Sequence, residues 1–91
     1  MAERARLVIS GDVQGVFYRA FVRERAQQHE LPGVVRNLPN GTVEAIAEGE
    51  RAALEHFVND CRQGTPSAKV TDIKVEWLPA TGEFQRFSIA F

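Results

Sequence analysis

The chain has 91 residues, of which 44% are apolar and 25% charged, and this composition is typical of one ordinary globular domain. Eleven basic and twelve acidic residues give a formal charge of −1, so no overall positive field attracts nucleic acid or an anionic membrane. We therefore expect a single domain over residues 1–91 that is a monomer and acts on a small molecule. A local excess of arginine in the first quarter could still attract a compact anion: Arg4, Arg6, Arg19, Arg23 and Arg25.

Cys61 is the only cysteine, which excludes an intrachain disulfide and leaves no second thiol for a zinc site. His29 and His56 stand alone and show no metal-ligand spacing with other residues, so we expect no metal. The first residues lack the apolar core of a signal peptide, and no apolar run is long enough to cross a membrane. These features favour a cytoplasmic protein.

The first two predicted elements are a strand and a helix. Residues 7–9 form a short run rich in β-branched side chains, and Gly11 follows soon after, which is typical of a buried strand. Residues 18–28 are rich in Arg, Glu, Gln and Ala with apolar side chains interspersed, and the pattern stops before Pro32. This second segment is predicted to be a helix that begins just after a glycine-containing loop.

A β-hairpin is predicted for residues 34–38 and 42–48, which flank the sequence Pro-Asn-Gly. The pair Asn40-Gly41 is typical of a type I′ turn, in which both central residues have positive φ. Apolar and mostly charged residues alternate along the second arm. We therefore expect one face of this strand to be buried and the face that carries Glu44 and Glu48 to meet water.

A second helix and two further strands complete the predicted elements. Leu54, Phe57, Val58 and Cys61 form an apolar stripe at helical spacing that ends before Gly64. Cys61 is therefore expected to be a small core residue and not a nucleophile. Residues 71–77 alternate as a strand does, and a short closing strand is predicted to carry Phe87, Ile89 and Phe91 on one face.

The order strand, helix, hairpin, helix, strand, with a short closing strand, is the split βαβ arrangement of the ferredoxin-like α+β folds. We expect an antiparallel sheet of four to five strands with both helices on one face. This architecture serves many functions, so the function has to be argued from a site.

The most informative segment is the loop over residues 11–18, between a buried strand and the start of a helix. Successive backbone N–H groups in such a loop can bind an anion, and the helix N-terminus behind it adds unpaired donors. Arg19 lies in the first helical turn, where side chains tilt back toward the N-terminus and hence toward this loop. Its guanidinium can donate to two phosphate oxygens. The Gly-x-x-x-x-Gly-Lys-Ser/Thr and Gly-x-Gly-x-x-Gly nucleotide motifs are absent from the sequence.

Two motifs resemble the signatures of the acylphosphatase family. Residues 11–19 read Gly-Asp-Val-Gln-Gly-Val-Phe-Tyr-Arg and are similar to the first signature, in which Val-Gln-Gly-Val precedes an aromatic residue and an arginine. Residues 33–37 read Gly-Val-Val-Arg-Asn and, with Gly41-Thr42-Val43 and Gly49 beyond them, resemble the second signature. The resemblance spans nearly the whole chain. It departs from the commonest pattern at Tyr18 and at Val34, neither of which is a catalytic position in the family.

The resemblance implies a stand-alone enzyme that hydrolyses the carboxyl-phosphate bond of acyl phosphates without a metal, a cofactor or a phosphoenzyme. Arg19 would bind the phosphate and Asn37 would position the attacking water. Inorganic phosphate or sulfate would bind as a product-like ligand. The backbone of the loop would hold the phosphoryl oxygens through Val13, Gln14, Gly15, Val16, Phe17 and Tyr18.

Three other functions are compatible with parts of this pattern. The first is a non-enzymatic sensor of small anions on the same fold, which would bind tightly without turnover. The second is an RNA-binding module, which the net charge and the lack of a Lys/Arg-Gly-aromatic run disfavour. The third is an acylphosphatase-like domain of a larger carbamoyl-transferring maturation factor, and no zinc motif accompanies this chain.

Overall fold

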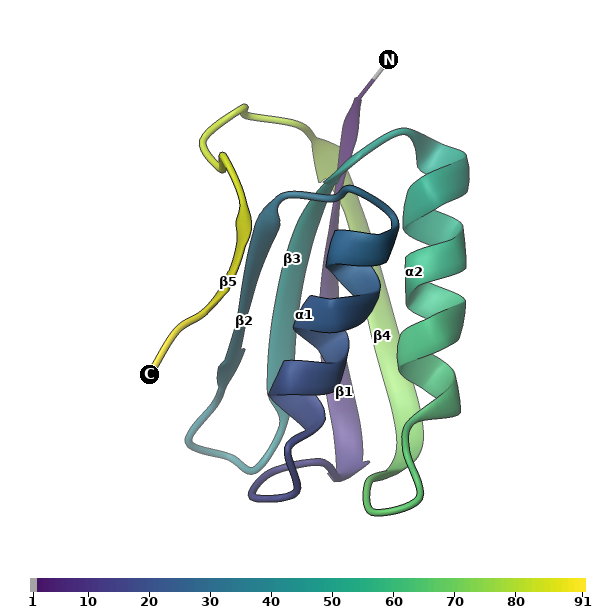
Figure 1. The fold of residues 1–91 in the computed structure, drawn as a ribbon, viewed down its shortest axis with the longest axis vertical. Coiled ribbons are helices and arrows are strands. Elements are labelled where there is room, and N and C mark those ends of the chain that lie inside the picture. Colours follow the sequence, from purple (N-terminus) through teal and green to yellow (C-terminus); the bar gives the residue numbers. More distant parts are fainter. Residues whose placement is uncertain (1) are drawn as a thin grey trace.

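The computed structural model describes residues 2–91, which form a five-stranded sheet with two helices on the same side of it (Figure 1). The strand order across the sheet is β4-β1-β3-β2-β5. Neither helix in the described part of the chain has the length and hydrophobicity that crossing a membrane requires. Along the chain the elements are β1 (Glu3–Asp12), α1 (Tyr18–Gln28), β2 (Gly33–Asn37), β3 (Val43–Gly49), α2 (Arg51–Gln63), β4 (Lys69–Pro79) and β5 (Phe87–Ile89).

The expected ferredoxin-like α+β fold is confirmed, with one difference in the sheet. β1 pairs antiparallel with β3 and with β4, and β2 pairs antiparallel with β3, but β5 runs parallel to β2. The reason is the connection over residues 80–86, which passes from the end of β4 to the start of β2 at the same end of the sheet (Figure 1). A strand that starts there can only run beside β2 in the same direction.

The core lies between the sheet and the two helices. From the sheet, β1 and β3 contribute fully buried residues at alternate positions, such as Leu7 and Ala45. The predicted stripe of α2 is confirmed, because Leu54, Phe57 and Cys61 are all fully buried. Burial also raises the pKa of the Cys61 thiol, so this cysteine is protonated and belongs to the core as expected.

The sequence predicts that the outer face of β3 meets water, but the structure shows that its glutamates are buried. Glu44 and Glu48 are only 5% and 4% exposed. Arginines on neighbouring strands cover them: Arg4 Nε lies 2.7 Å from Glu48, and Arg6 Nε and Arg36 Nε lie 2.6 and 2.7 Å from Glu44. Burial by itself would raise the pKa of the Glu44 carboxyl, but the hydrogen bonds from Arg36 and Arg6 lower it below its ordinary value.

The hairpin between β2 and β3 is confirmed, but its turn is not of type I′. Leu38 O accepts a hydrogen bond from Gly41 N at 3.1 Å, so Pro39 and Asn40 are the central residues, and only Gly41 follows with positive φ, at 92°. Proline fixes φ near −65°, which suits the first central position of a type I turn and excludes a positive φ there. The proline, not the Asn-Gly pair, therefore decides the turn.

Candidate active site

The loop after β1, the β2–β3 turn and the C-terminus lie at one end of the molecule (Figure 1). β1 ends at Asp12 and α1 begins at Tyr18, so residues 13–17 form the connection between them. β2 ends at Asn37, and β5, parallel to β2, ends at Ile89. The parallel pairing is what brings the last residues of the chain to the end of the sheet that carries the loop.

The loop over residues 13–17 has backbone donors that the fold leaves free. Among the described residues, none of these N–H groups donates to a backbone carbonyl. α1 begins without a side-chain cap, so the N–H groups of its first turn add to this set. Gly15 has a φ of 74° and Phe17 a φ of 60°, and these two left-handed residues bend the chain sharply into the helix. Such a loop offers several backbone donors to one anion.

The Gln14 side chain fixes the loop to the hairpin. Its Nε2 donates to Leu38 O at 2.9 Å and to Thr42 O at 2.8 Å. These two carbonyls flank the turn, and Leu38 directly follows Asn37 in the chain. The amide of Gln14 therefore sets the position of the end of β2 relative to the loop.

Tyr18, where the family signature more often has phenylalanine or methionine, is 1% exposed. Its hydroxyl donates to Cys61 O at 2.7 Å, in the last turns of α2. Burial raises the pKa of this hydroxyl, so it stays protonated and keeps the hydrogen bond. The substitution thus connects the start of α1 to α2.

Arg19 differs in its partners from four other arginines, three on the sheet and one at the start of α2. Arg4, Arg6, Arg36 and Arg51 all form ion pairs with glutamates. Arg19 forms no ion pair within residues 2–91; its Nη1 lies 3.3 Å from Ala90 O, and its guanidinium carbon lies 4.9 Å from the centroid of the Phe91 ring. A guanidinium with no carboxylate beside it keeps its donors for an incoming anion.

Arg19 and Asn37 line the same cavity, although α1 and β2 carry them separately. This cavity has a volume of about 370 Å³, and its other lining residues are Arg36, Ala90 and Phe91. A neighbouring cavity of about 340 Å³ is lined by loop residues, by Arg19 and by the end of the chain. The structure therefore brings the two predicted site residues together next to the predicted loop.

The sequence did not point to Arg36, Ala90 or Phe91 as neighbours of the site. Arg36 stands inside the second motif, but nothing in its own spacing distinguishes it from a surface residue. Phe91 was expected on the apolar face of the closing strand, whereas it lies beyond β5 and is fully exposed. No local pattern reports that the chain end returns to Arg19, because that contact comes from the parallel pairing of β5.

The early arginines do not form one anion-binding cluster. Arg4 and Arg6 lie on the outer face of the sheet with glutamate partners. Arg25 lies 5.2 Å from the ring centroid of Phe21 and donates to Gln28. Of the five, the structure places only Arg19 at the loop.

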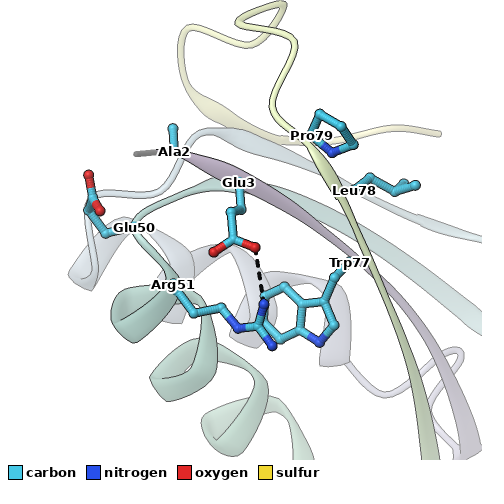
Figure 2. A pocket seen from close by; sticks show the side chains of 7 residues that line it. All are labelled: Ala2, Glu3, Glu50, Arg51, Trp77, Leu78 and Pro79. Carbon is cyan, nitrogen blue, oxygen red and sulfur yellow. Dashed lines mark hydrogen bonds and ion pairs between the residues drawn. The ribbon is translucent and has the colours of Figure 1, made fainter.

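Another cavity, of about 620 Å³, is at the other end of the sheet. Figure 2 shows Arg51 over the Trp77 ring and paired with Glu3 in this cavity. The Arg51 side chain lies 3.0 Å from Glu3, 3.1 Å from Glu55 and 3.6 Å from the Trp77 centroid. Two carboxylates already neutralise this guanidinium and repel an anion, so this cavity is a poor phosphate site.

Metal ligands do not gather at either end. Within residues 2–91 no three His, Cys, Asp or Glu side chains lie close enough together to hold a metal ion. His29 Nε2 lies 2.8 Å from Asp60, and the His29 ring stacks on the ring of His56. These contacts connect the end of α1 to α2.

Comparisons with known proteins agree with this geometry. Residues 5–89 match the family model described as Acylphosphatase. An acylphosphatase of Pelotomaculum thermopropionicum is 47% identical over 88 residues, which cover 97% of this chain and 96% of the relative. The crystal structure of acylphosphatase from Bacillus subtilis has a TM-score of 0.93 and 40% identity, and the match covers 98% of this chain and 99% of that one.

The same unit is also found inside a longer protein. The crystal structure of full-length HypF in the phosphate- and nucleotide-bound form matches all of this chain with a TM-score of 0.84 and 26% identity. The match covers only 12% of that chain, whereas it covers nearly all of the Bacillus subtilis acylphosphatase. From its motifs, fold and relatives, this chain belongs to the acylphosphatase family.

Proposed function

We propose that this protein hydrolyses acyl phosphates to a carboxylate and inorganic phosphate. Arg19 and the backbone of residues 13–18 would bind the phosphoryl group, and Asn37 would orient the attacking water. The observation that supports this most is the cavity that Arg19 and Asn37 share beside the loop. Family membership agrees with the same reaction.

The phosphoryl group in this proposal is held by fixed donors. The loop N–H groups that lack a backbone partner and the Arg19 guanidinium both donate hydrogen bonds to the equatorial oxygens of the phosphoryl group. Charge on those oxygens changes during the transfer, and donors already in place need no reorganisation to stabilise it. Because Ala90 O and the Phe91 ring hold the guanidinium from one side, it is oriented before the substrate arrives.

Asn37 supplies the second half of the reaction. Its side-chain amide offers both a donor and an acceptor, so it can hold a water in one orientation. When a water is held in line with the departing group, most of the rate enhancement comes from this positioning. The leaving group is a carboxylate whose conjugate acid has a pKa of about 4, so it departs without an enzymic proton donor. This explains how a site can work with no general acid, and the proton of the water would pass to the substrate itself.

The family and the relatives favour the enzyme over a non-enzymatic anion sensor, and turnover tests this directly. We expect the protein to hydrolyse a generic aryl acyl phosphate such as benzoyl phosphate, and to do so at the same rate with a chelator present. A simple phosphomonoester should not be hydrolysed, because its alkoxide leaving group needs a proton donor. Phosphate binding without any hydrolysis would favour the sensor.

Three variants test the division of labour. Arg19→Gln should lose both phosphate affinity and turnover, whereas Asn37→Ala should lose roughly 10² to 10³ in kcat with phosphate affinity largely kept. Arg51→Gln is the matched control, because it removes an arginine from the far cavity of Figure 2. Its activity should stay within about twofold of wild type. Equal loss of phosphate binding in Arg19→Gln and Asn37→Ala would overturn the assignment of Asn37 to the water.

The setting of the reaction is also a proposal. The single thiol is buried in the core and needs no oxidising compartment, which fits a cytoplasmic enzyme. We expect a monomer that needs no cofactor, with inorganic phosphate or sulfate as a weak product-like ligand. Size-exclusion chromatography with light scattering would measure the first property, and competition by inorganic phosphate would measure the last.

A further inference from the structure

We propose that the cavity of about 340 Å³ beside Arg19 is an acyl subsite that favours aromatic or other apolar acyl groups. The inference rests on the proposed function and names its substrate class. We define the acyl subsite by the three apolar side chains that surround this cavity together with the loop: Phe17, Ile89 and Phe91.

Two exposed phenylalanines line this one cavity. Phe17 is 89% exposed and Phe91 103%, and within residues 2–91 no other large apolar side chain is classed as exposed. Single apolar residues scattered over a surface are ordinary, but these two are far apart in the sequence and line the same hollow. Apolar surface gathered in this way is typical of a place where a ligand is bound.

Phe17 keeps its exposed position at a cost in backbone strain. It is the N-cap of α1, with φ 60° and ψ 19°, in the left-handed region that bulky residues rarely adopt. The neighbouring Tyr18 is 1% exposed, so the core lies one residue away. Glycine or asparagine would fit the Phe17 backbone more easily. A strained residue with an exposed ring at a binding loop favours a role in contact with a ligand.

The lining also restricts the chemistry of the acyl group. Among the described residues that line the cavity, only Arg19 has a charged side chain, and the phosphoryl group would occupy its guanidinium. The remaining side chains are apolar or, in Tyr18, already hydrogen-bonded to Cys61 O. A polar acyl group such as carbamoyl or glyceroyl would lose hydrogen bonds to water there without gaining partners.

The size of the cavity fits a phosphoryl group with a ring attached. A volume of about 340 Å³ lies in the range of pockets that bind small molecules, which leaves room for a ring beside the phosphoryl group. Because the acyl carbon is bonded to a phosphate oxygen, the acyl group must lie next to Arg19. The Phe91 ring centroid is 4.9 Å from the Arg19 guanidinium carbon, which places this ring beside that group.

The test compares kcat/KM for benzoyl phosphate with kcat/KM for acetyl phosphate in each variant. Damage to the phosphate-binding groups lowers both values and cancels in their ratio. The intrinsic reactivity of the two substrates cancels when the ratio of a variant is divided by that of wild type. Phe17→Asn removes one ring while keeping a residue that tolerates the left-handed backbone, and Phe91→Ser removes the other. We expect each change to lower the ratio about tenfold, as is common when an apolar pocket loses its contacts.

Phe84→Ser is the matched control, since Phe84 also stacks on an arginine, Arg4, but away from the loop. Its ratio should equal that of wild type. A second measurement needs no turnover: benzylphosphonate should inhibit or bind wild type more tightly than methylphosphonate, and Phe17→Asn and Phe91→Ser should remove this difference. Hydrolysis of both substrates with an unchanged ratio in both variants would overturn the acyl subsite while leaving the proposed function intact. Absence of hydrolysis in wild type would overturn the proposed function, and the phosphonates would still test the subsite.

Discussion

Gln14 gives the sharpest test of how the fold positions the site. Its side-chain amide uses both hydrogens on carbonyls of the hairpin, at 2.9 Å to Leu38 O and 2.8 Å to Thr42 O. Gln14→Ala removes both of these hydrogen bonds, so the side chain at position 14 no longer holds the loop against the hairpin. Because Leu38 follows Asn37, we expect the change to displace the group that orients the water.

The expected magnitudes follow from these two contacts. A neutral hydrogen bond contributes about 0.5 to 1.5 kcal/mol net, so the free energy of unfolding should fall by about 1 to 3 kcal/mol. A small displacement of a positioning group can cost up to about 10² in rate, and we expect kcat to fall at least about tenfold. Gln14→Glu keeps the shape but places carboxylate oxygens against two carbonyls. It should be less stable than Gln14→Ala, because repulsion replaces the missing bonds.

Urea unfolding at neutral pH measures the stabilities, and steady-state hydrolysis of benzoyl phosphate measures kcat. The order wild type, Gln14→Ala, Gln14→Glu in stability is the predicted result. If Gln14→Ala matched wild type in both stability and kcat, the side chain would not connect the loop to the hairpin in solution. A loss of stability at unchanged kcat would show that the connection does not position Asn37.

Two further predictions concern buried polar groups outside the loop. Tyr18→Phe leaves Cys61 O without its 2.7 Å partner, so thermal or urea unfolding should show a loss of about 1 to 3 kcal/mol, with kcat within about twofold of wild type; an unchanged stability would count against the bond. The second prediction concerns Glu48. Burial alone would raise the pKa of its carboxyl, but hydrogen bonds from Thr81, Arg4 and Gly82 lower this pKa from the ordinary 4.5 to about 2. A carboxyl whose pKa is lower in the folded state stabilises the protein at pH values above its unfolded-state pKa. This stabilisation is lost as the pH falls from about 4.5 to about 2. At about 1.4 kcal/mol per pKa unit this stabilisation amounts to at most about 3.5 kcal/mol. Glu48→Gln should therefore be less stable than wild type at pH 7 and should approach it as the pH falls to about 2; a gap that stays constant with pH would contradict this.

The helices were predictable because their signals are local. The apolar stripe that contains Leu54, Phe57 and Cys61 predicts α2, and the glycine after it predicts where the helix ends. Residues 18–28 likewise form a helix at the predicted bounds. In both cases the residues that decide the structure are neighbours in sequence.

The sheet was less predictable because its partners are distant in sequence. β1 extends from Glu3 to Asp12, beyond the predicted residues 7–9, because pairing with β3 and β4 on both sides carries the flanking charged residues into the strand. The burial of Glu44 depends on arginines from two other strands. No pattern within one strand reports such contacts.

The candidate site divides in the same way. That Arg19 faces the loop was predictable from its place in the first helical turn, whereas Asn37 was assigned from the resemblance of its motif. Their roles in the reaction stay predictions. The residues that complete their surroundings, Ala90 and Phe91, reach Arg19 only through the parallel pairing of β5 with β2. That pairing follows from the direction of a long connection and not from the composition of the closing strand.

In the proposed function the backbone of residues 13–18 and Arg19 together bind a phosphoryl group. Titration of ¹⁵N-labelled protein with inorganic phosphate, followed through the amide resonances, tests it most directly. We expect saturable shifts that are largest for the amides of residues 13–18 in wild type and that disappear in Arg19→Gln. Shifts centred elsewhere, or a titration that Arg19→Gln leaves unchanged, would contradict it.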